Sequence, residues 1–380
     1  MTEYAVRTQT DLKRLIRAAG ACDDTIAECV KSIGVDAVVH AVMREVLDRT
    51  DLRGCPAAEV LFRLHGGAPP QSQGSDVVIR VADDGTVALA TMSTASVTAT
   101  VAQSLPEVVR SVFGPRGSAS TATRVLQWTA ESSPETFGRP DPAFETVRRL
   151  LDSIDRSYHA SLAELCVRSG SDKWGVHQYP QHYERHFQTV RDRPLTILEI
   201  GVGGYDNPRR GGESLRMWKR YFPRAAVYGI DIIDKSSLSE SRMTILRADQ
   251  ADPVDLARVL EITGPLDIII DDGSHVSAHV IATFALLFPA LRSGGMYVIE
   301  DLQTSYWPHF GGKAGVYDDM ETSVGFLKAM VDGLNHAEID NRAQASTDAC
   351  VKGMHFYHNL AFLEKGENRD EGAPSWLRGL

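Results

Sequence analysis

Two pairs of acidic residues, Asp271-Asp272 and Glu300-Asp301, each follow an apolar run of the kind that forms a buried strand. Adjacent strands lie ~4.8 Å apart, so these carboxylates are expected to meet at one rim of a sheet. Crowded carboxylates repel one another unless a cation or protons intervene, and a hard divalent ion such as Mg²⁺ takes oxygen ligands. We therefore predict Asp272, Glu300 and Asp301 as ligands of Mg²⁺ and assign Asp271 to the adjoining cofactor pocket. The alternative is that these acids only cap the following helices.

A histidine stands three residues beyond the first of these predicted ligands. His275 follows Asp272 on the same turn, and an imidazole with a pKa near 6.5 can take a proton from a metal-bound hydroxyl at neutral pH. We predict His275 as the catalytic base. His279, four residues further on, is interpreted as structural.

A glycine-rich loop follows an earlier expected strand. Gly201-Val-Gly203-Gly204 comes directly after residues 195–200, and such glycines allow a ligand to approach the backbone closely. Asp231 ends the next strand, where a carboxylate can accept two hydrogen bonds from a ribose diol. The predicted cofactor contacts are Glu199, Gly201, Gly203, Tyr205, Ser214, Asp231, Asp249, Gln250 and Asp271.

The identity of the cofactor is decided by the loop and its acidic neighbour. A dinucleotide loop usually runs directly into a helix whose N-terminus meets the pyrophosphate, but residues 205–212 interrupt it here. Glu199 also suits a cationic, zwitterionic ligand better than a diphosphate. S-adenosylmethionine (SAM) is therefore predicted over NAD(P), although a nicotinamide oxidoreductase stays open as an alternative.

Two aromatic stretches are candidates for the acceptor side of the site. Tyr306-Trp307 stands in a run with glycines, and His177 and Tyr179 stand in the histidine-rich run 171–187. Aromatic faces suit the apolar side of a sugar, so these four residues are predicted substrate contacts, with core packing as the equal alternative. The i,i+4 pair of His182 and His186 could bind zinc, but HExxH is absent and no third ligand is evident.

The elements that must position these residues alternate along the second part of the chain. Apolar strands separated by amphipathic helices indicate a parallel sheet covered on both faces, and a closing hairpin turned at Asn359 follows. The predicted fold is therefore α/β: a Rossmann-like doubly wound sheet with a C-terminal antiparallel hairpin. Its expected strands are residues 195–200, 226–231, 243–248, 266–271, 295–300, 353–358 and 360–364.

The first part of the chain reads as a separate α+β domain. Helices are expected over 6–18, 25–33, 37–47, 105–113 and 121–128, with a hairpin from 76 to 91 turned at Asp84-Gly85. Residues 130–142 have the composition of a linker. We place the boundary there, with an auxiliary or oligomerisation domain at 1–140 and a SAM-dependent methyltransferase domain at 141–380.

Composition narrows the class of protein further. The 380 residues carry a net charge of −10, which disfavours nucleic acid as a partner. The longest apolar stretch is far shorter than the ~20 residues that span a bilayer, so no membrane segment is expected, and no signal peptide is seen. Five cysteines without a CxxC pair favour reduced thiols and a cytoplasmic location.

Several motifs resemble the metal-dependent SAM O-methyltransferases of antibiotic deoxysugars, most closely the mycinamicin and demethylmacrocin (tylosin) macrolide sugar 2-O-methyltransferase group. The resemblance runs from about Asp172 through Trp376, whereas residues 1–140 share little beyond length and helical character. It implies Mg²⁺ on Asp272, Glu300 and Asp301, His275 as the base, and homo-oligomers (dimers or tetramers) in which the auxiliary domain helps to close the site. The motifs are residues 198–205, 214–219, 270–275, 297–301, 355–359 and 370–374.

These observations give one functional hypothesis with open alternatives. We expect Mg²⁺-dependent methyl transfer from SAM to a deoxysugar hydroxyl of a small-molecule glycoside, as in macrolide antibiotic biosynthesis. A metal-dependent O-methyltransferase of an aromatic or polyketide diol and a non-catalytic SAM-binding module are the alternatives besides the oxidoreductase. Residues 313–321 do not match the resemblance clearly, which leaves the acceptor open.

Overall fold

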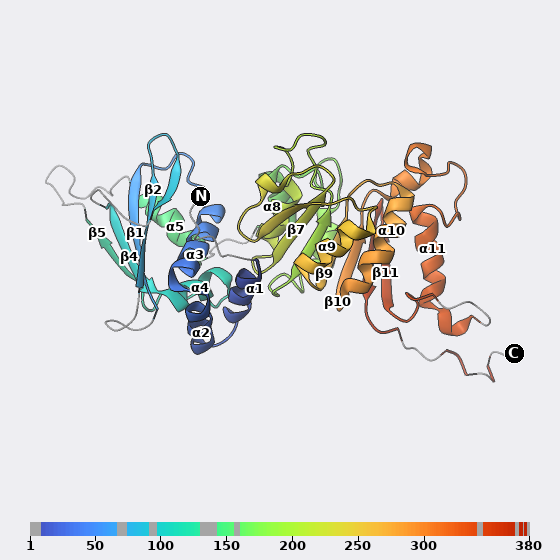
Figure 1. Ribbon diagram of the computed structural model, residues 1–380, viewed down its shortest axis with the longest axis horizontal. Helices are drawn as coiled ribbons and strands as arrows, with labels where there is room; N and C mark the ends of the chain where they lie inside the picture. The colour runs from blue at the N-terminus through green and yellow to red at the C-terminus, as the bar shows by residue number, and fades with distance from the viewer. Residues whose placement is uncertain are drawn as a thin grey trace. The chain divides into compact units, whose positions relative to one another are not determined.

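The computed structural model describes residues 9–66, 74–90, 97–129, 143–155, 160–339, 345–368, 372–374 and 376–377. The chain forms two compact units (Figure 1). Unit 1 contains Met1–Ser161, Thr189–Pro194 and Arg220–Ala225. Unit 2 contains Leu162–Gln188, Leu195–Lys219 and Ala226–Leu380.

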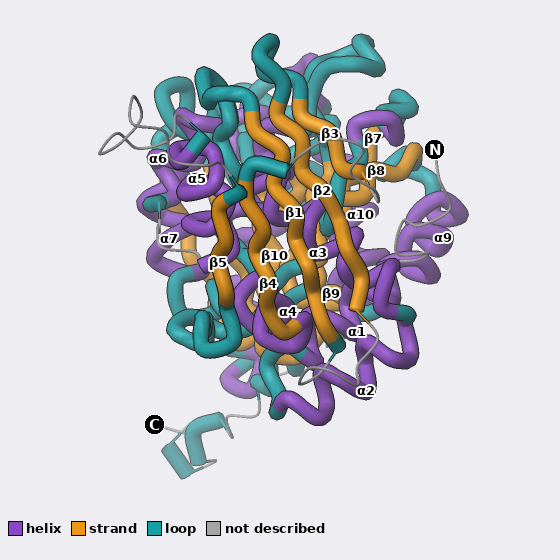
Figure 2. Tube along the Cα trace, turned by 90° about the vertical axis from the view of Figure 1, so that its left-hand side faces the viewer, coloured by secondary structure: helices purple, strands orange, loops and turns teal. Residues whose placement is uncertain are grey.

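Unit 1 is an α+β unit with a five-stranded sheet of order β3-β2-β1-β4-β5. Figure 2 shows these strands side by side, with α3 and α4 behind them. Helix side chains at three- and four-residue spacing, such as Leu12, Leu15 and Ile16, are buried in its core. Its helices are α1 (Gln9–Ala18), α2 (Asp23–Ile33), α3 (Val35–Arg49), α4 (Leu105–Phe113) and α5 (Phe144–Asp155). Its strands are β1 (Ala58–His65), β2 (Gly74–Val81), β3 (Val87–Ala90), β4 (Ala99–Ser104) and β5 (Val125–Trp128).

One predicted helix of unit 1 is wrong. Residues 121–128 were expected to be helical, but Val125–Trp128 form strand β5, antiparallel to β4. The segment is too short for helical periodicity to be diagnostic, and pairing with β4 supplies the backbone hydrogen bonds instead. The sequence also did not predict β1, the central strand of this sheet.

Two short segments from later in the chain belong to unit 1, and one buried arginine bonds to several parts of that unit. The guanidinium of Arg224 donates to the carbonyl oxygens of Phe113 (2.9 Å), Ile16 (3.0 Å) and Asp192 (3.0 Å). These bonds satisfy carbonyl groups at the ends of elements that are far apart in the sequence. Burial lowers the pKa of Arg224, with Asp192 acting in the opposite direction.

Unit 2 is built on a seven-stranded sheet of order β11-β12-β10-β9-β6-β7-β8. The strands from β10 to β8 run parallel, and β12 and β11 are antiparallel, as predicted. Every residue of β6 is buried, which fits a sheet covered on both faces. The strands are β6 (Thr196–Ile200), β7 (Ala226–Asp231), β8 (Met243–Arg247), β9 (Leu266–Asp271), β10 (Leu291–Ile299), β11 (Val351–Tyr357) and β12 (Leu360–Lys365).

The helices of unit 2 follow the alternation expected for this fold. The closing hairpin turns at Asn359, whose φ of +61° is tolerated by asparagine better than by most residues. The helices are α6 (Leu162–Ser169), α7 (Pro180–Phe187), α8 (Glu213–Tyr221), α9 (Pro253–Thr263), α10 (Ser277–Leu287) and α11 (Ser323–Leu334).

Some predictions on organisation fall on residues that the structure does not describe. The linker expected at 130–142 lies outside the described residues, so the boundary at 140/141 stays a prediction; helix α5, which follows it, packs into the core of unit 1. All five cysteines are free thiols, and the cytoplasmic location stays a prediction. Within the described residues, no helix combines the length and the apolar character that a membrane crossing requires.

Candidate functional site

A cavity of about 760 Å³ lies in unit 2, where the carboxyl ends of its parallel strands meet. This is the edge at which doubly wound sheets bind ligands. Most of the predicted site residues line it: Gly201, Gly203, Tyr205, Ser214, Asp231, Asp249, Gln250, Asp272, His275, Glu300, Asp301 and His177. The structure therefore brings the strand-end residues together around one cavity, as the sequence predicted.

The glycine loop after β6 needs glycine where it approaches the neighbouring strand end. Gly201 has a φ of +89°, and a Cβ there would lie 2.1 Å from the carbonyl oxygen of Asp272. Lys235, fully buried, donates from Nζ to the carbonyl oxygens of Gly203 and Tyr205 (the latter at 2.8 Å). The sequence did not single out Lys235, which fixes the loop's backbone. Tyr205 itself is 94% exposed.

Asp231 and Asp249 stand at the carboxyl ends of the next two strands, as predicted. The Asp231 carboxylate accepts hydrogen bonds from the backbone N–H of Val202 (3.2 Å) and Ile233 (2.9 Å). These bonds hold it at the cavity wall, where it can accept from a diol. The Asp249 carboxylate accepts from the N–H of Ala251 (2.8 Å).

Four predicted cofactor residues support the cavity wall through internal hydrogen bonds. Glu199 is fully buried and accepts from Ser214 Oγ (2.8 Å) and Trp218 Nε1 (3.2 Å). The Gln250 side chain donates to Asp271 Oδ1 (3.3 Å) and accepts from the N–H of Ser274 (2.7 Å). Glutamine thereby connects the ends of β8 and β9.

Asp271 is the least satisfied acid in this wall. Its Oδ2 is buried without a hydrogen-bond partner among the described residues. Burial raises the pKa of Asp271 to about 7, and hydrogen bonds from Gln250 and Gly273 oppose the rise. A raised pKa is the expected response of a desolvated carboxyl group.

A buried lysine joins the carboxylates that the sequence predicted as metal ligands. Lys173 Nζ lies 2.6 Å from Glu300 Oε1, 2.7 Å from Asp272 Oδ2 and 3.4 Å from Glu199 Oε1. Its side chain is 1% exposed. The ammonium therefore supplies part of the positive charge that the crowded carboxylates require. Sequence reasoning missed it because a single lysine in a polar run carries no signal of burial.

The pKa shifts in this cluster follow from burial and mutual charge. Burial alone would lower the pKa of Lys173, but the carboxylates of Asp272, Glu300 and Glu199 outweigh it and raise that pKa. Burial raises the pKa of Glu300, with Asp272 adding to the rise and Lys173 opposing it. The Tyr183 hydroxyl also donates to Glu300 Oε1, a contact that the sequence did not predict.

The third predicted ligand, Asp301, is surrounded by aromatic and imidazole side chains. Tyr179 donates from its hydroxyl to Asp301 Oδ1 (2.8 Å), and burial raises the pKa of that hydroxyl, with Asp301 adding to the rise. His177 Nδ1 and His275 Nε2 each lie 3.8 Å from an Asp301 oxygen. Tyr179 thus orients a predicted metal ligand, and its assignment to the substrate stays a prediction.

His275 and Asp301 both adopt left-handed backbone conformations, with φ of +56° and +54°. Non-glycine residues rarely adopt this conformation, and those that do cluster at functional sites. Of the five such residues in the described chain, His275, Asp301 and Tyr205 line the cavity. The loops after β9 and β10 therefore hold the predicted base and ligand in specific, costly conformations.

The donor set fits a divalent cation at Asp272 and Asp301. The ligand atoms of Asp272, Asp301 and His275 lie within 4.8 Å of one another, and Asp272 also groups in this way with Glu199 and Glu300. The Asp272 and Asp301 side chains are 26% and 18% exposed, so they can share an ion with water molecules, as Mg²⁺ prefers. Glu300, engaged by Lys173 and Tyr183, stays a predicted ligand.

Two of the predicted substrate contacts lie apart from the cavity wall. Tyr306 ends the short helix Leu302–Tyr306, and Trp307 precedes Pro308–Phe310; they are 39% and 49% exposed. Neither is among the described residues that line the cavity. Their assignment to the substrate stays a prediction.

Comparison with known proteins shows likeness along the whole chain. The family model described as "MycE methyltransferase N-terminal" matches residues 12–124. The 8-demethyl-8-α-L-rhamnosyl tetracenomycin-C 2′-O-methyltransferase of Streptomyces olivaceus is 46% identical, with 96% of this chain and 97% of the relative covered. The mycinamicin VI 2″-O-methyltransferase of Micromonospora griseorubida is 36% identical, with 99% and 96% covered.

A solved structure shows the same likeness in three dimensions. The MycE methyltransferase from the mycinamycin biosynthetic pathway, in complex with Mg, SAH and mycinamycin VI, has a TM-score of 0.84 to this chain and 35% sequence identity. The alignment covers 97% of this chain and 96% of that one. Both units therefore have counterparts in a single known protein.

Replacing Lys173 by methionine is expected to destabilise the protein strongly. The substitution removes the ammonium but leaves Glu199, Asp272 and Glu300 crowded, and breaking a buried ion pair in this way costs roughly 3–5 kcal/mol. The measurement is the free energy of unfolding of unit 2 by denaturant titration without divalent ions. Lys328→Met is the matched control, because that lysine is 47% exposed and pairs with exposed Asp318. Equal stability of the two variants would show that Lys173 does not balance the cluster.

Proposed function

We propose, on the premise that this chain belongs to the sugar O-methyltransferases of antibiotic biosynthesis, that its acceptor is the 2-hydroxyl of a deoxysugar on a glycosylated natural product. The protein is a SAM-dependent sugar O-methyltransferase that works with Mg²⁺ on a glycoside. The observation that carries the choice of hydroxyl is the 46% identity, over almost the full length of both chains, to a rhamnosyl 2′-O-methyltransferase. The oxidoreductase alternative finds no support among these relatives.

The residues of the cavity divide between the methyl donor and the metal. SAM supplies a methyl group that its sulfonium makes electrophilic, and the glycine loop, Asp231 and Asp249 would hold it. Mg²⁺, when bound, lowers the pKa of a hydroxyl that it contacts, and Asp272 and Asp301 would hold it, with Glu300 as the third carboxylate. Lys173 keeps Glu300 and Glu199 in place through its ion pairs.

We propose that His275 removes the proton of the acceptor hydroxyl. Its imidazole lines the cavity, and Nε2 lies 3.8 Å from Asp301 Oδ2. The oxygen forms its bond to the methyl carbon as the carbon–sulfur bond breaks, and the hydroxyl proton passes to the imidazole. The Asp301 carboxylate then stabilises the imidazolium, so one acid serves both the metal and the base.

The other imidazole beside Asp301 faces the same cavity and suits the sugar. His177 lines the cavity and stacks on Tyr179 with ring centroids 4.6 Å apart, while Tyr179 is held by Asp301. This stack offers His177 as a hydrogen-bonding group next to the metal ligands. A second sugar hydroxyl near the metal would lie within its reach, which supports an acceptor with neighbouring hydroxyls.

Methyl transfer to a defined acceptor tests the function and the position together. With SAM and Mg²⁺, the enzyme is expected to methylate 8-demethyl-8-α-L-rhamnosyl tetracenomycin C, lose turnover in EDTA, and regain it when Mg²⁺ is added back. The matched control acceptor is the corresponding 2-methoxy-rhamnosyl compound, which lacks the free 2-hydroxyl. Mass spectrometry follows both. Methylation of the 2-methoxy compound would contradict the 2-hydroxyl assignment, and full turnover in EDTA would contradict the metal.

Replacing His275 by asparagine is expected to preserve SAM binding and to reduce kcat by roughly 10²–10⁴. Asparagine tolerates the left-handed backbone of this position, so the loss reports on the imidazole. His279→Asn is the control, because His279 also lines the cavity but bonds to Ser274 Oγ (3.0 Å). Calorimetry with SAM and single-turnover rates separate binding from chemistry. A near-normal rate for the His275 variant would remove it from the role of base.

We also propose that the protein forms a homo-oligomer through unit 1. Val87 on edge strand β3, and Val125 and Leu126 on edge strand β5, are 40–52% exposed, which is unfavourable in a free sheet edge. A second copy of the chain is the occupant that the family resemblance implies. Light scattering is expected to give a dimer or tetramer, and Leu126→Glu to shift it towards smaller species. A monomeric wild-type protein at micromolar concentration would refute this.

A further inference from the structure

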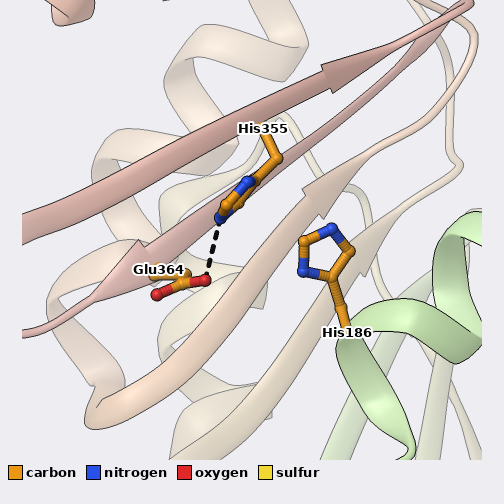
Figure 3. Close-up of side chains that lie close together, drawn as sticks. All are labelled: His186, His355 and Glu364. Carbon is orange, nitrogen blue, oxygen red and sulfur yellow. Dashed lines mark hydrogen bonds and ion pairs between the residues drawn. The ribbon is translucent and has the colours of Figure 1, made fainter.

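Three side chains of types that can bind a metal ion meet in unit 2, where helix α7 contacts the closing hairpin. His186 is on α7, His355 on β11 and Glu364 on β12. The cluster therefore joins a helix to two strands that come much later in the chain. His186 also contacts Tyr357 of the same hairpin, which follows it by 171 residues. Figure 3 shows the imidazole of His186 facing the His355–Glu364 pair. None of the three is among the described residues that line the cavity. The cluster therefore lies outside the site described above.

The geometry is close to that of a metal site. His355 Nε2 lies 2.9 Å from Glu364 Oε1, and the rings of His186 and His355 have centroids 4.6 Å apart. One ligand atom from each residue lies within 4.8 Å of the others. Tetrahedral Zn²⁺, with bonds of about 2.0–2.2 Å, places its ligand atoms about 3.4 Å apart. Small side-chain rotations are therefore enough to reach the bound geometry.

His186 is held in a defined orientation by its neighbours. Its Nε2 lies 2.9 Å from the hydroxyl of Tyr357, and its ring stacks on Phe362 with centroids 4.3 Å apart. Tyr357 is itself stacked on His182, at 3.9 Å. When Nε2–H donates to the Tyr357 hydroxyl, Nδ1 carries the lone pair. A histidine that binds a metal usually donates a hydrogen bond from its other ring nitrogen, and this bond fixes the orientation of the ring.

We infer that His186, His355 and Glu364 form a second metal site, for a borderline divalent transition-metal ion such as Zn²⁺. Two imidazoles and one carboxylate are a known zinc donor set, and water can complete the coordination. Mg²⁺ is a poor occupant because it prefers oxygen ligands. The His355 and Glu364 side chains are 42% and 37% exposed, so an ion can reach them from solvent.

An ion at this site would fasten α7 to the closing hairpin. The same helix carries Tyr183, which donates to Glu300, and follows directly on Tyr179, which donates to Asp301. The hairpin contributes the carbonyl oxygen of Asn359, which accepts from Leu302 N–H (3.1 Å) beside Asp301. The second site is therefore structural: it stiffens the supports of the catalytic carboxylates and takes no part in the chemistry.

Zinc titration of the metal-free protein tests the site. After chelation, Zn²⁺ alone is expected to raise Tm, because a ligand that binds only the folded state stabilises it. His355→Gln and Glu364→Gln each remove one ligand and should weaken Zn²⁺ binding at least about tenfold, measured by calorimetry. Tyr357→Phe should weaken it by roughly 10–100-fold, since it removes the hydroxyl that orients His186. Co²⁺ adds a spectroscopic readout, because four-coordinate Co²⁺ with imidazole ligands absorbs strongly in the visible.

Two further variants separate this site from the catalytic carboxylates. His358→Gln changes an exposed histidine of the same hairpin outside the cluster and should leave Zn²⁺ binding unchanged. Asp272→Asn alters the predicted Mg²⁺ site and should preserve the Zn²⁺-dependent rise in Tm. The inference is overturned if Zn²⁺ leaves Tm of the wild-type protein unchanged. It is equally overturned if Asp272→Asn abolishes the rise while His355→Gln and Glu364→Gln retain it.

Discussion

The ion pairs between one buried ammonium and three carboxylates are the constraint on which the site depends. Lys173 contacts Glu199, Asp272 and Glu300, which come from the ends of three adjacent strands. Without a cation between them, these strand ends would repel one another in a region of low dielectric. The lysine therefore allows the acids to be present together before any metal binds, while Asp272, Glu300 and Asp301 line the cavity.

Around this centre, each functional side chain is held by a neighbour from a different element. Tyr179 orients Asp301, Gln250 connects Asp271 to the loop before His275, and Lys235 fixes the glycine loop. Such supports pre-organise a methyl transfer, in which correct alignment of oxygen and methyl is a large part of the rate enhancement. His275 and Asp301 themselves stand in left-handed backbone conformations, which are common at functional sites.

Predictability differed between the two units for a physical reason. In unit 2, runs of buried β-branched residues alternate with amphipathic helices, and those patterns predicted every strand of the sheet to within a few residues. In unit 1, β1 (eight residues) and β5 (four residues) were not predicted as strands, and their place in the sheet depends on pairing with β2 and β4. Backbone pairing between distant segments leaves little trace in local sequence.

The sequence by itself determined the order of strands along unit 2, the glycine loop, and the acids and histidine at the strand ends, because carboxyl ends of parallel strands must share one edge. Only the tertiary structure decided which groups touch. It placed Lys173 among the carboxylates, gave Tyr179 a hydrogen bond to Asp301, and brought His355 and Glu364 to His186. These contacts join residues far apart along the chain, and their side-chain directions follow from packing, which residue type and spacing alone do not specify.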